Sequence, residues 1–282
     1  MTKRVSFIGF GRAGEALARL MVVSGYGVVG DVLTTSLESA QLAVARLGEG
    51  TAASSYAMLN PASVWVLAVP DSSISECAQE LANLPDHIVK GALVFHLSGV
   101  NSSALLTPLI EKGARIASFH MLRSCSDPET VAATFDGTYC GCEGPARDEV
   151  AQLTRVIGGE PFFLSGDTKP LYHASCVCAS NFIVGIIEVA RNLALRSGLS
   201  SDESYRLLEP LVRGTVSAVF SLGTKRALTG PVTRGDESTI RTHLEVIQNS
   251  IPEMSEVYRV LTQVLLHLNP HEGIRRSLDK DT

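Results

Sequence analysis

Four residues at successive four-residue steps stand out in a largely apolar segment of the sequence: Lys169, His173, Val177 and Asn181. On a helix these steps place side chains on one face, so the three polar residues form a stripe that Val177 interrupts. Reduction of a carbonyl group needs a proton donor and a hydrogen-bonding amide beside the oxygen that becomes an alkoxide. His173 could be that donor, Lys169 could replace it if burial lowers its pKa, and Asn181 could hold the substrate. The alternative is structural, with Lys169 solvated and His173 and Asn181 satisfied within a packed interface.

A glycine motif near the N-terminus indicates what such a stripe would face. A short β-branched and aromatic run ends at Gly9, Gly11 and Gly14 complete G-x-G-x-x-G, and an apolar helical pattern follows at once. In a dinucleotide site the first glycine makes the tight turn, the second lets a pyrophosphate approach the backbone, and the third lets the helix pack on the strand. We therefore predict a dinucleotide-binding turn that also contains Phe10, Arg12 and Ala13, the alternative being an ordinary glycine-rich turn.

The segment after the second predicted strand bears on the choice between NADP and NAD. Asp31 follows Gly11 at about the spacing of the acid that binds the ribose of NAD, but the apolar run continues past it, so it is expected inside the strand. The loop that follows, Thr34-Thr35-Ser36, is neutral and rich in hydroxyl groups, and Arg12 could supply a cation for a 2′-phosphate. NADP is thus favoured, with NAD left open because of Asp31.

Two further strand ends are expected at the same edge of the sheet, where ligands of open α/β sheets bind. One carries Val69, Pro70 and Asp71, and the other carries Ser98 and Gly99. These residues are predicted to lie beside the cofactor, whereas His96 is expected to be packed inside its strand.

Candidate substrate residues come from two places. His120 and Arg123 follow the end of a predicted strand, and Arg234 and Asp236 lie in a glycine- and proline-containing loop at residues 229–236. Arg234 could clamp a carboxylate or phosphate through its planar guanidinium. Equally, Arg234 and Asp236 could pair with each other and hold the loop.

Strand and helix patterns alternate through the first half of the chain, which is typical of a doubly wound, mostly parallel sheet. Strands are predicted at residues 5–8, 26–33, 51–55, 64–69, 92–97, 115–119, 138–143 and 161–164, and helices at 37–47, 74–84, 105–112 and 147–157. From about residue 169 the pattern is one long apolar helix to 197, then further helices to about 268. We expect a dinucleotide-binding domain over residues 1–165 and an all-α domain over 166–282.

Composition narrows the class of protein. The 282 residues are 45% hydrophobic and 19% charged with a net charge of −5, as in an ordinary soluble enzyme. Without runs of like charge, nucleic acid is not an expected partner, and neither a membrane span nor a signal peptide is indicated, so the protein is expected in the cytoplasm. The six cysteines are expected to be reduced thiols, because the spacing of their Cys-x-Cys pairs does not suit a metal site.

The chain resembles bacterial Rossmann-like proteins whose C-terminal domain has no assigned function. They look like a branch of the β-hydroxyacid dehydrogenase superfamily, alongside ketopantoate reductase and pyrroline-5-carboxylate reductase. The resemblance is carried by Gly9–Gly14, Leu67–Asp71, His96–Gly99, Ala117–His120, Tyr172–Ala174 with Ser180-Asn181, and Ala227–Asp236. It implies a Rossmann domain, an all-α dimerising domain and NADP binding.

Two departures from these relatives affect what carries over. Many of them have Ser-Arg where this chain has Leu33-Thr34, and ketopantoate reductases have a lysine followed by asparagines at two four-residue steps. Here those steps are His173, Val177 and Asn181, so only Asn181 carries over, and either His173 or Lys169 would take the place of the lysine.

Together these patterns predict an NADP-dependent oxidoreductase that transfers hydride to a small carbonyl acid, with a 2-oxo acid similar to ketopantoate as first candidate. An imine reductase similar to pyrroline-5-carboxylate reductase is one alternative, and a non-catalytic NADP sensor or scaffold is another. The long apolar helix has more apolar surface than one small domain covers, which predicts a homodimer through the C-terminal helices.

Overall fold

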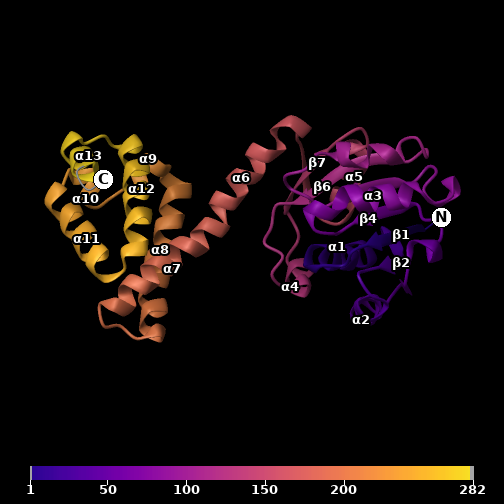
Figure 1. The fold of residues 1–282 in the computed structure, drawn as a ribbon, viewed down its shortest axis with the longest axis horizontal. Helices are drawn as coiled ribbons and strands as arrows, with labels where there is room; N and C mark the ends of the chain where they lie inside the picture. Colours follow the sequence, from indigo (N-terminus) through magenta and orange to yellow (C-terminus); the bar gives the residue numbers. More distant parts are fainter. Residues whose placement is uncertain (1, 280–282) are drawn as a thin grey trace. The chain divides into compact units, whose positions relative to one another are not determined.

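The computed structural model describes residues 2–279, which form two compact units, one ending at Ser180 and the other starting at Asn181 (Figure 1). The first unit is built on an eight-stranded sheet in the order β3-β2-β1-β4-β5-β6-β7-β8. All neighbouring strands are parallel except β6 and β7. The strands are β1 (Lys3–Ile8), β2 (Gly27–Leu33), β3 (Thr51–Ala53), β4 (Val64–Leu67), β5 (Leu93–His96), β6 (Arg115–Met121), β7 (Tyr139–Glu143) and β8 (Glu160–Phe163). The predicted doubly wound, mostly parallel sheet is confirmed.

Strand β4 shows why the sheet is central to this unit. All four of its residues are buried, and successive side chains point to opposite faces. Val64 and Val66 join the core that includes helices α1 and α5, whereas Trp65 and Leu67 join the core that includes helix α3. Covering both faces leaves the carboxyl edge of the sheet as the place where loops can form a site.

The helices of the first unit are α1 (Arg12–Val23), α2 (Leu37–Leu47), α3 (Ile74–Ala82), α4 (Pro128–Ala133), α5 (Arg147–Val156) and α6 (Lys169–Ala179). Local signals fix their ends: the Ser36 hydroxyl caps α2 by accepting from the Ser39 amide at 3.1 Å. The helix predicted at residues 105–112 is wrong, because a 3₁₀ helix spans Ser103–Leu109 and contains Pro108, which has no amide to donate. Helix α4 was not predicted.

The second unit is all helical, as expected. Its helices are α7 (Asn181–Arg196), α8 (Ser201–Leu222), α9 (Thr224–Ala227), α10 (Pro231–Arg234), α11 (Glu237–Ser250), α12 (Pro252–Leu268) and α13 (Glu272–Asp279). Its buried core consists of Val232, Ile240, Leu244, Leu266, Ile274 and Leu278.

The predicted long helix changes character at Ser180, whose φ of −129° and ψ of −69° interrupt the run between α6 and α7. The two compact units also separate at this residue, and the predicted domain boundary between residues 165 and 166 lies just before α6. The physical reason is that α6 is anchored to the sheet by Lys169, which is buried in the first unit.

Candidate cofactor and active site

The glycine turn has the geometry that the motif predicts. Gly9 has a φ of +77°, and a Cβ there would lie 2.5 Å from the carbonyl oxygen of Ala68, so only glycine fits. A Cβ on Gly14 would lie 2.6 Å from the Cβ of Ala68, which keeps α1 close to the sheet. At Gly11 a Cβ would meet no atom within 4 Å, so this backbone is open to a ligand. The turn therefore fits a dinucleotide pyrophosphate at the start of α1.

A cavity of about 670 Å³ opens from this turn. The predicted cofactor residues that line it are Gly9, Phe10, Gly11, Thr34, Thr35, Val69 and Pro70, and further lining residues include Ser39, Leu42, Arg46, Ser54, Ser55, Tyr56, Cys77 and Glu80. Of the other predicted residues, Ser36 caps α2, and Ala13 packs partly buried against the core. Asp71 is not part of the lining. The cavity joins the carboxyl ends of β1, β2 and β4, where an open sheet binds its ligand.

Asp31 is a structural residue, as its place inside β2 suggests. Its carboxylate is buried, accepts from Arg4 at 2.8 Å and accepts from the Asn60 amide at 2.7 Å. These partners occupy both oxygens, so Asp31 does not offer the carboxylate that an NAD ribose would need.

Arg12 was predicted as the cation near the cofactor, but it does not line this cavity. It lines a neighbouring hollow with Glu15, Arg19 and the α4 segment, whereas Arg46 lines both spaces. Arg46 was missed, although Ser39, Leu42 and Arg46 share one face of α2 by their spacing and could have been found from it.

A second group of buried polar residues lies under the ends of β5 and β6. The Lys169 side chain is fully buried, and its Nζ donates to the Ser98 carbonyl at 3.0 Å and to the Ser118 hydroxyl at 2.6 Å. Ser118 donates in turn to Glu143 at 2.9 Å, and Glu143 also accepts from the Ser103 amide at 2.7 Å. A buried ammonium group is thus linked through one hydroxyl to a buried carboxylate.

Burial lowers the pKa of Lys169 to about 8, and the nearby Glu143 carboxylate opposes part of that change. The lysine is therefore still mostly protonated at neutral pH. Its positive charge lies beneath the candidate site.

His120, Tyr172 and His173 form a cluster against Gly99. The Nδ1 atom of His120 lies 2.9 Å from the Tyr172 hydroxyl, and the His120 ring meets the rings of Tyr172 and His173 edge-to-face, at centroid distances of 5.7 and 5.8 Å. A Cβ on Gly99 would overlap the ring of His173 and lie 2.8 Å from Nε2 of His120. Ser98, Gly99, His120, Lys169 and His173 are thus brought together as a site.

Burial, together with the charges of Lys169 and His173, lowers the pKa of His120 to about 4. His120 is therefore a neutral imidazole at neutral pH. Burial raises the pKa of Tyr172, which keeps its hydroxyl protonated.

Arg123 and Asp236, two other predicted site residues, make contacts within their own segments. Arg123 donates to the carbonyl and hydroxyl of Thr134 and to Thr138, and so holds the segment before β7. Asp236 caps α11 by accepting from the Thr239 amide at 3.1 Å, and hydrogen bonds from Thr239 and Ser238 lower its pKa. It is therefore bound mainly by its own helix rather than by Arg234. Asn181, Arg234 and Asp236 belong to the second unit.

Sequence reasoning placed Ser118 beside His120 at a strand end, but it gave no site role to Glu143 or Tyr172. The pairing of Ser118 with Glu143 depends on the antiparallel register of β6 and β7, which no local pattern reveals. His96 is packed as expected, with Nε2 lying 3.1 Å from the Ser102 carbonyl and burial lowering its pKa to about 4.

Comparison with known proteins matches two families along the chain, and the second match begins just before β7, within the first compact unit. Residues 2–121 match the Rossmann-like domain family, and residues 138–265 match a domain of unknown function, DUF2520. The chain is a Rossmann-like protein with a C-terminal DUF2520 domain. No curated protein matches it significantly.

Solved structures share the fold along nearly the whole chain. One, described as a candidate NADP oxidoreductase from Bacteroides fragilis, has 22% identity and a TM-score of 0.76, covering 94% of this chain and 98% of its own. An imine reductase from Myxococcus stipitatus in complex with NADP⁺ has 15% identity and a TM-score of 0.68, with coverages of 98% and 100%. A pyrroline-5-carboxylate reductase from Coxiella burnetii has 18% identity and a TM-score of 0.57, with coverages of 99% and 98%. At these identities the likeness concerns the fold.

Proposed function

We propose that the protein is an NADPH-dependent reductase that delivers hydride to the carbon of a small carbonyl acid. The observation that carries the proposal is that one sheet edge bears both an open glycine turn, with its cavity, and the cluster of His120, Tyr172, His173 and Lys169. NADPH, when bound, supplies the hydride. Gly9 and Gly11 would hold its pyrophosphate, and Thr34 and Thr35 would face its adenosine end.

The side chains of the cluster have distinct tasks. His173 is half-buried at Gly99 and is the proposed proton donor to the substrate oxygen. The Nδ1 atom of His120 shares a hydrogen bond with the Tyr172 hydroxyl, which fixes the ring with Nε2 facing Gly99, and we assign the proton of the neutral ring to Nε2. Lys169 places a buried positive charge near the oxygen that becomes an alkoxide.

That positive charge favours a carbonyl substrate over an iminium substrate. Reduction of a carbonyl develops negative charge on oxygen, which a buried ammonium group stabilises, whereas a protonated imine is itself a cation and is repelled. A 2-oxo acid remains the first substrate class to test.

Imine reduction is the second candidate function. It is favoured by the fold, because similar structures include an imine reductase and a reductive aminase from Aspergillus terreus in complex with NADPH. A neutral Lys169, above its pKa, would remove the repulsion of an iminium group.

The test is to mix the protein with NADPH and panels of 2-oxo acids and cyclic imines, and to follow nicotinamide absorbance. Steady oxidation by 2-oxo acids alone supports the proposal, and oxidation by imines alone selects the second candidate. Tight NADPH binding with no substrate consumed would instead support the sensor alternative.

For the quaternary state we propose a homodimer through the second unit. Helices α7 and α8 expose large apolar side chains, among them Phe182, Val184, Leu211 and Phe220, and a cavity of about 660 Å³ lies between these two helices.

The stretch Gly166–Arg196 is long and apolar enough to cross a membrane, with a mean hydropathy of 1.5, although a single such helix is weak support for a span. A second copy would cover the same surface. A monomer mass by light scattering at micromolar concentration, or a need for detergent, would contradict the dimer.

A further inference from the structure

The cavity beside the glycine turn contains a basic side chain that the glycine motif does not account for. Among the described residues that line the cavity, Arg46 alone carries a positive charge, and it lies in the last turn of α2. Glu76 and Glu80 on α3 also line the cavity. An anionic group of a ligand in this cavity would therefore be drawn toward Arg46 and away from α3.

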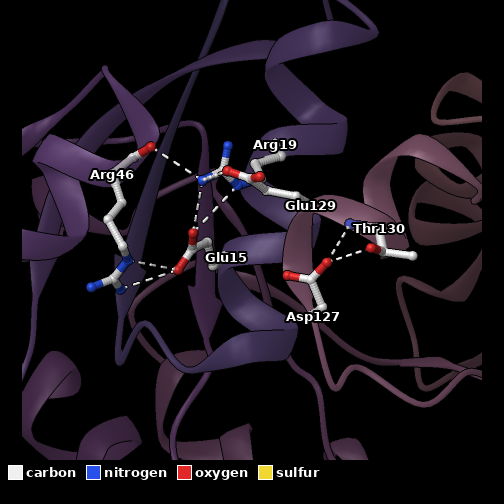
Figure 2. Close-up of polar contacts among 6 residues, drawn as sticks. All are labelled: Glu15, Arg19, Arg46, Asp127, Glu129 and Thr130. Carbon is white, nitrogen blue, oxygen red and sulfur yellow. Dashed lines mark hydrogen bonds and ion pairs between the residues drawn. The ribbon is translucent and has the colours of Figure 1, made fainter.

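Arg46 is held in place by the carboxylate of Glu15 beside it (Figure 2). Its Nε donates to one oxygen of Glu15 at 3.1 Å, while Arg19 donates to the other oxygen at 2.9 Å. Arg19 also donates to the backbone carbonyl of Arg46 at 3.1 Å, which ties the end of α2 to α1. Glu15 is 9% exposed and Arg46 is 52% exposed, so the carboxylate is fixed while the guanidinium still reaches solvent.

The charge balance leaves Arg46 able to accept an anion. Glu15 is shared by two guanidinium groups, so the three side chains together carry one positive charge. Glu129 lies 3.4 Å from Arg19, on the α4 side, and is 76% exposed, so solvent screens it. The uncompensated charge is thus on the side where Arg46 meets the cavity.

Hydroxyl groups line the same cavity as Arg46. Thr34, Thr35 and Ser39 are among its lining residues, and the Thr34 hydroxyl lies 2.9 Å from that of Ser39. These groups surround the N-terminus of α2, an eleven-residue helix. A guanidinium, hydroxyl groups and a helix N-terminus are together the donors that a phosphate dianion prefers.

We infer that Arg46 binds the 2′-phosphate of NADP(H) and so selects it over NAD(H), with Glu15 as the positioning residue. This inference rests on the proposed function only in requiring an adenine dinucleotide in the cavity. In this inference Arg46 takes the place of Arg12, the cation predicted from the sequence. Asp31 also favours NADP(H) over NAD(H), because its carboxylate is already bonded to Arg4 and Asn60 and is not free to bind the ribose of NAD.

The experiment measures dissociation constants for NADPH, NADH, adenosine 2′,5′-bisphosphate and adenosine 5′-monophosphate. Arg46→Met keeps an unbranched apolar stem and removes the charged guanidinium group. We expect it to weaken binding of the two 2′-phosphorylated ligands by about 10- to 100-fold and to change the other two by less than about threefold. Arg12→Met is the matched control, and it should leave the preference for the 2′-phosphate unchanged.

Two further variants separate positioning from folding. Arg46→Lys keeps the charge without the planar fork and should retain part of the preference. Glu15→Gln should reduce the preference less than Arg46→Met does, while a circular dichroism spectrum equal to that of the wild type shows that the fold persists. An equal loss for all four ligands, or an unchanged preference in Arg46→Met, would overturn the inference.

The inference and the proposed function fail separately. Suppose that the wild-type protein binds adenosine 2′,5′-bisphosphate through Arg46 but that none of the substrates tested causes NADPH to be oxidised. The inference then stands and the reductase proposal falls. If it reduces substrates equally well with NADH and NADPH, the reductase proposal stands and the inference falls. If it binds none of the four ligands, both are wrong.

Discussion

Each unit of the molecule contains a histidine–tyrosine pair of nearly the same geometry. His120 and Tyr172 in the first unit are 2.9 Å apart at Nδ1 and the hydroxyl, with ring centroids at 5.7 Å. His243 and Tyr258 in the second unit are 2.7 Å apart at the same atoms, also with centroids at 5.7 Å. The local contact alone therefore does not distinguish a site from a structural pair.

What differs is the surroundings of the two pairs. His120 has a buried ammonium group and a second imidazole nearby, lies at the carboxyl edge of a sheet and has a pKa lowered to about 4. His243 on α11 contacts Tyr258 on α12, and Tyr258 packs against the core of the helical unit. We therefore expect a histidine–tyrosine pair to take part in chemistry only where charged and titratable groups surround it. Four predictions test this expectation.

The largest expected effect is on turnover. His173→Ala should lower kcat by about 10²–10⁴ and leave the dissociation constant of NADPH unchanged, because the change removes the proposed proton donor and leaves the cofactor cavity intact. The matched change in the second unit, His243→Ala, should leave kcat within about twofold. Steady-state kinetics checks both, and unchanged turnover in His173→Ala would remove this residue from the proposed mechanism.

The second prediction concerns stability at alkaline pH. The pKa of Lys169 falls from its ordinary 10.5 to about 8 on folding, so between these values the unfolded chain holds a proton that the folded protein has lost. The free energy of unfolding of the wild type should therefore rise with pH relative to Lys169→Met, by about 3 kcal/mol across this range. Urea unfolding at several pH values measures the difference, and parallel curves would show that the lysine is not buried as described.

A smaller effect is expected from the two tyrosines. Tyr172→Phe removes the hydroxyl that fixes the His120 ring and should lower kcat by about tenfold, whereas Tyr258→Phe should affect only stability, by about 1 kcal/mol. Kinetics and thermal unfolding of both variants form one comparison. Equal kinetic effects would mean that the pairs do not differ as we describe.

The smallest effect tests a predicted substrate residue. Asp236→Ala removes the cap of α11 and should cost about 1 kcal/mol of unfolding free energy, with KM unchanged. A large rise in KM without loss of stability would instead restore Asp236 as a substrate ligand.

The sequence predicted those features that depend on neighbours in the chain. Gly9 and Gly14 predict the turn because each acts on its immediate surroundings. The boundaries of α2 follow from a capping serine at its start and a glycine at its end. The alternation of strands and helices was likewise enough to infer the parallel sheet. The 3₁₀ segment at Ser103–Leu109 was missed because its apolar spacing resembles that of a helix.

The site was only half predictable, for a physical reason. Lys169, His173 and His120 carry recognisable side-chain chemistry, but Glu143 reaches Ser118 only through an antiparallel register between β6 and β7. The stripe to Asn181 assumed an unbroken helix, which Ser180 interrupts. The β6–β7 register and the backbone deviation at Ser180 are both set by tertiary packing. The spacing of residues along the chain contains no information about either.

Gly99 gives a practical guide to the evolution of this site. Both imidazole rings occupy the space that its side chain would need, so the two histidines and the glycine form one steric unit. A relative with a larger residue at this position must have moved or replaced a ring, whatever its overall similarity. Joint retention of the three residues would therefore separate relatives that kept this chemistry from those that kept only the fold.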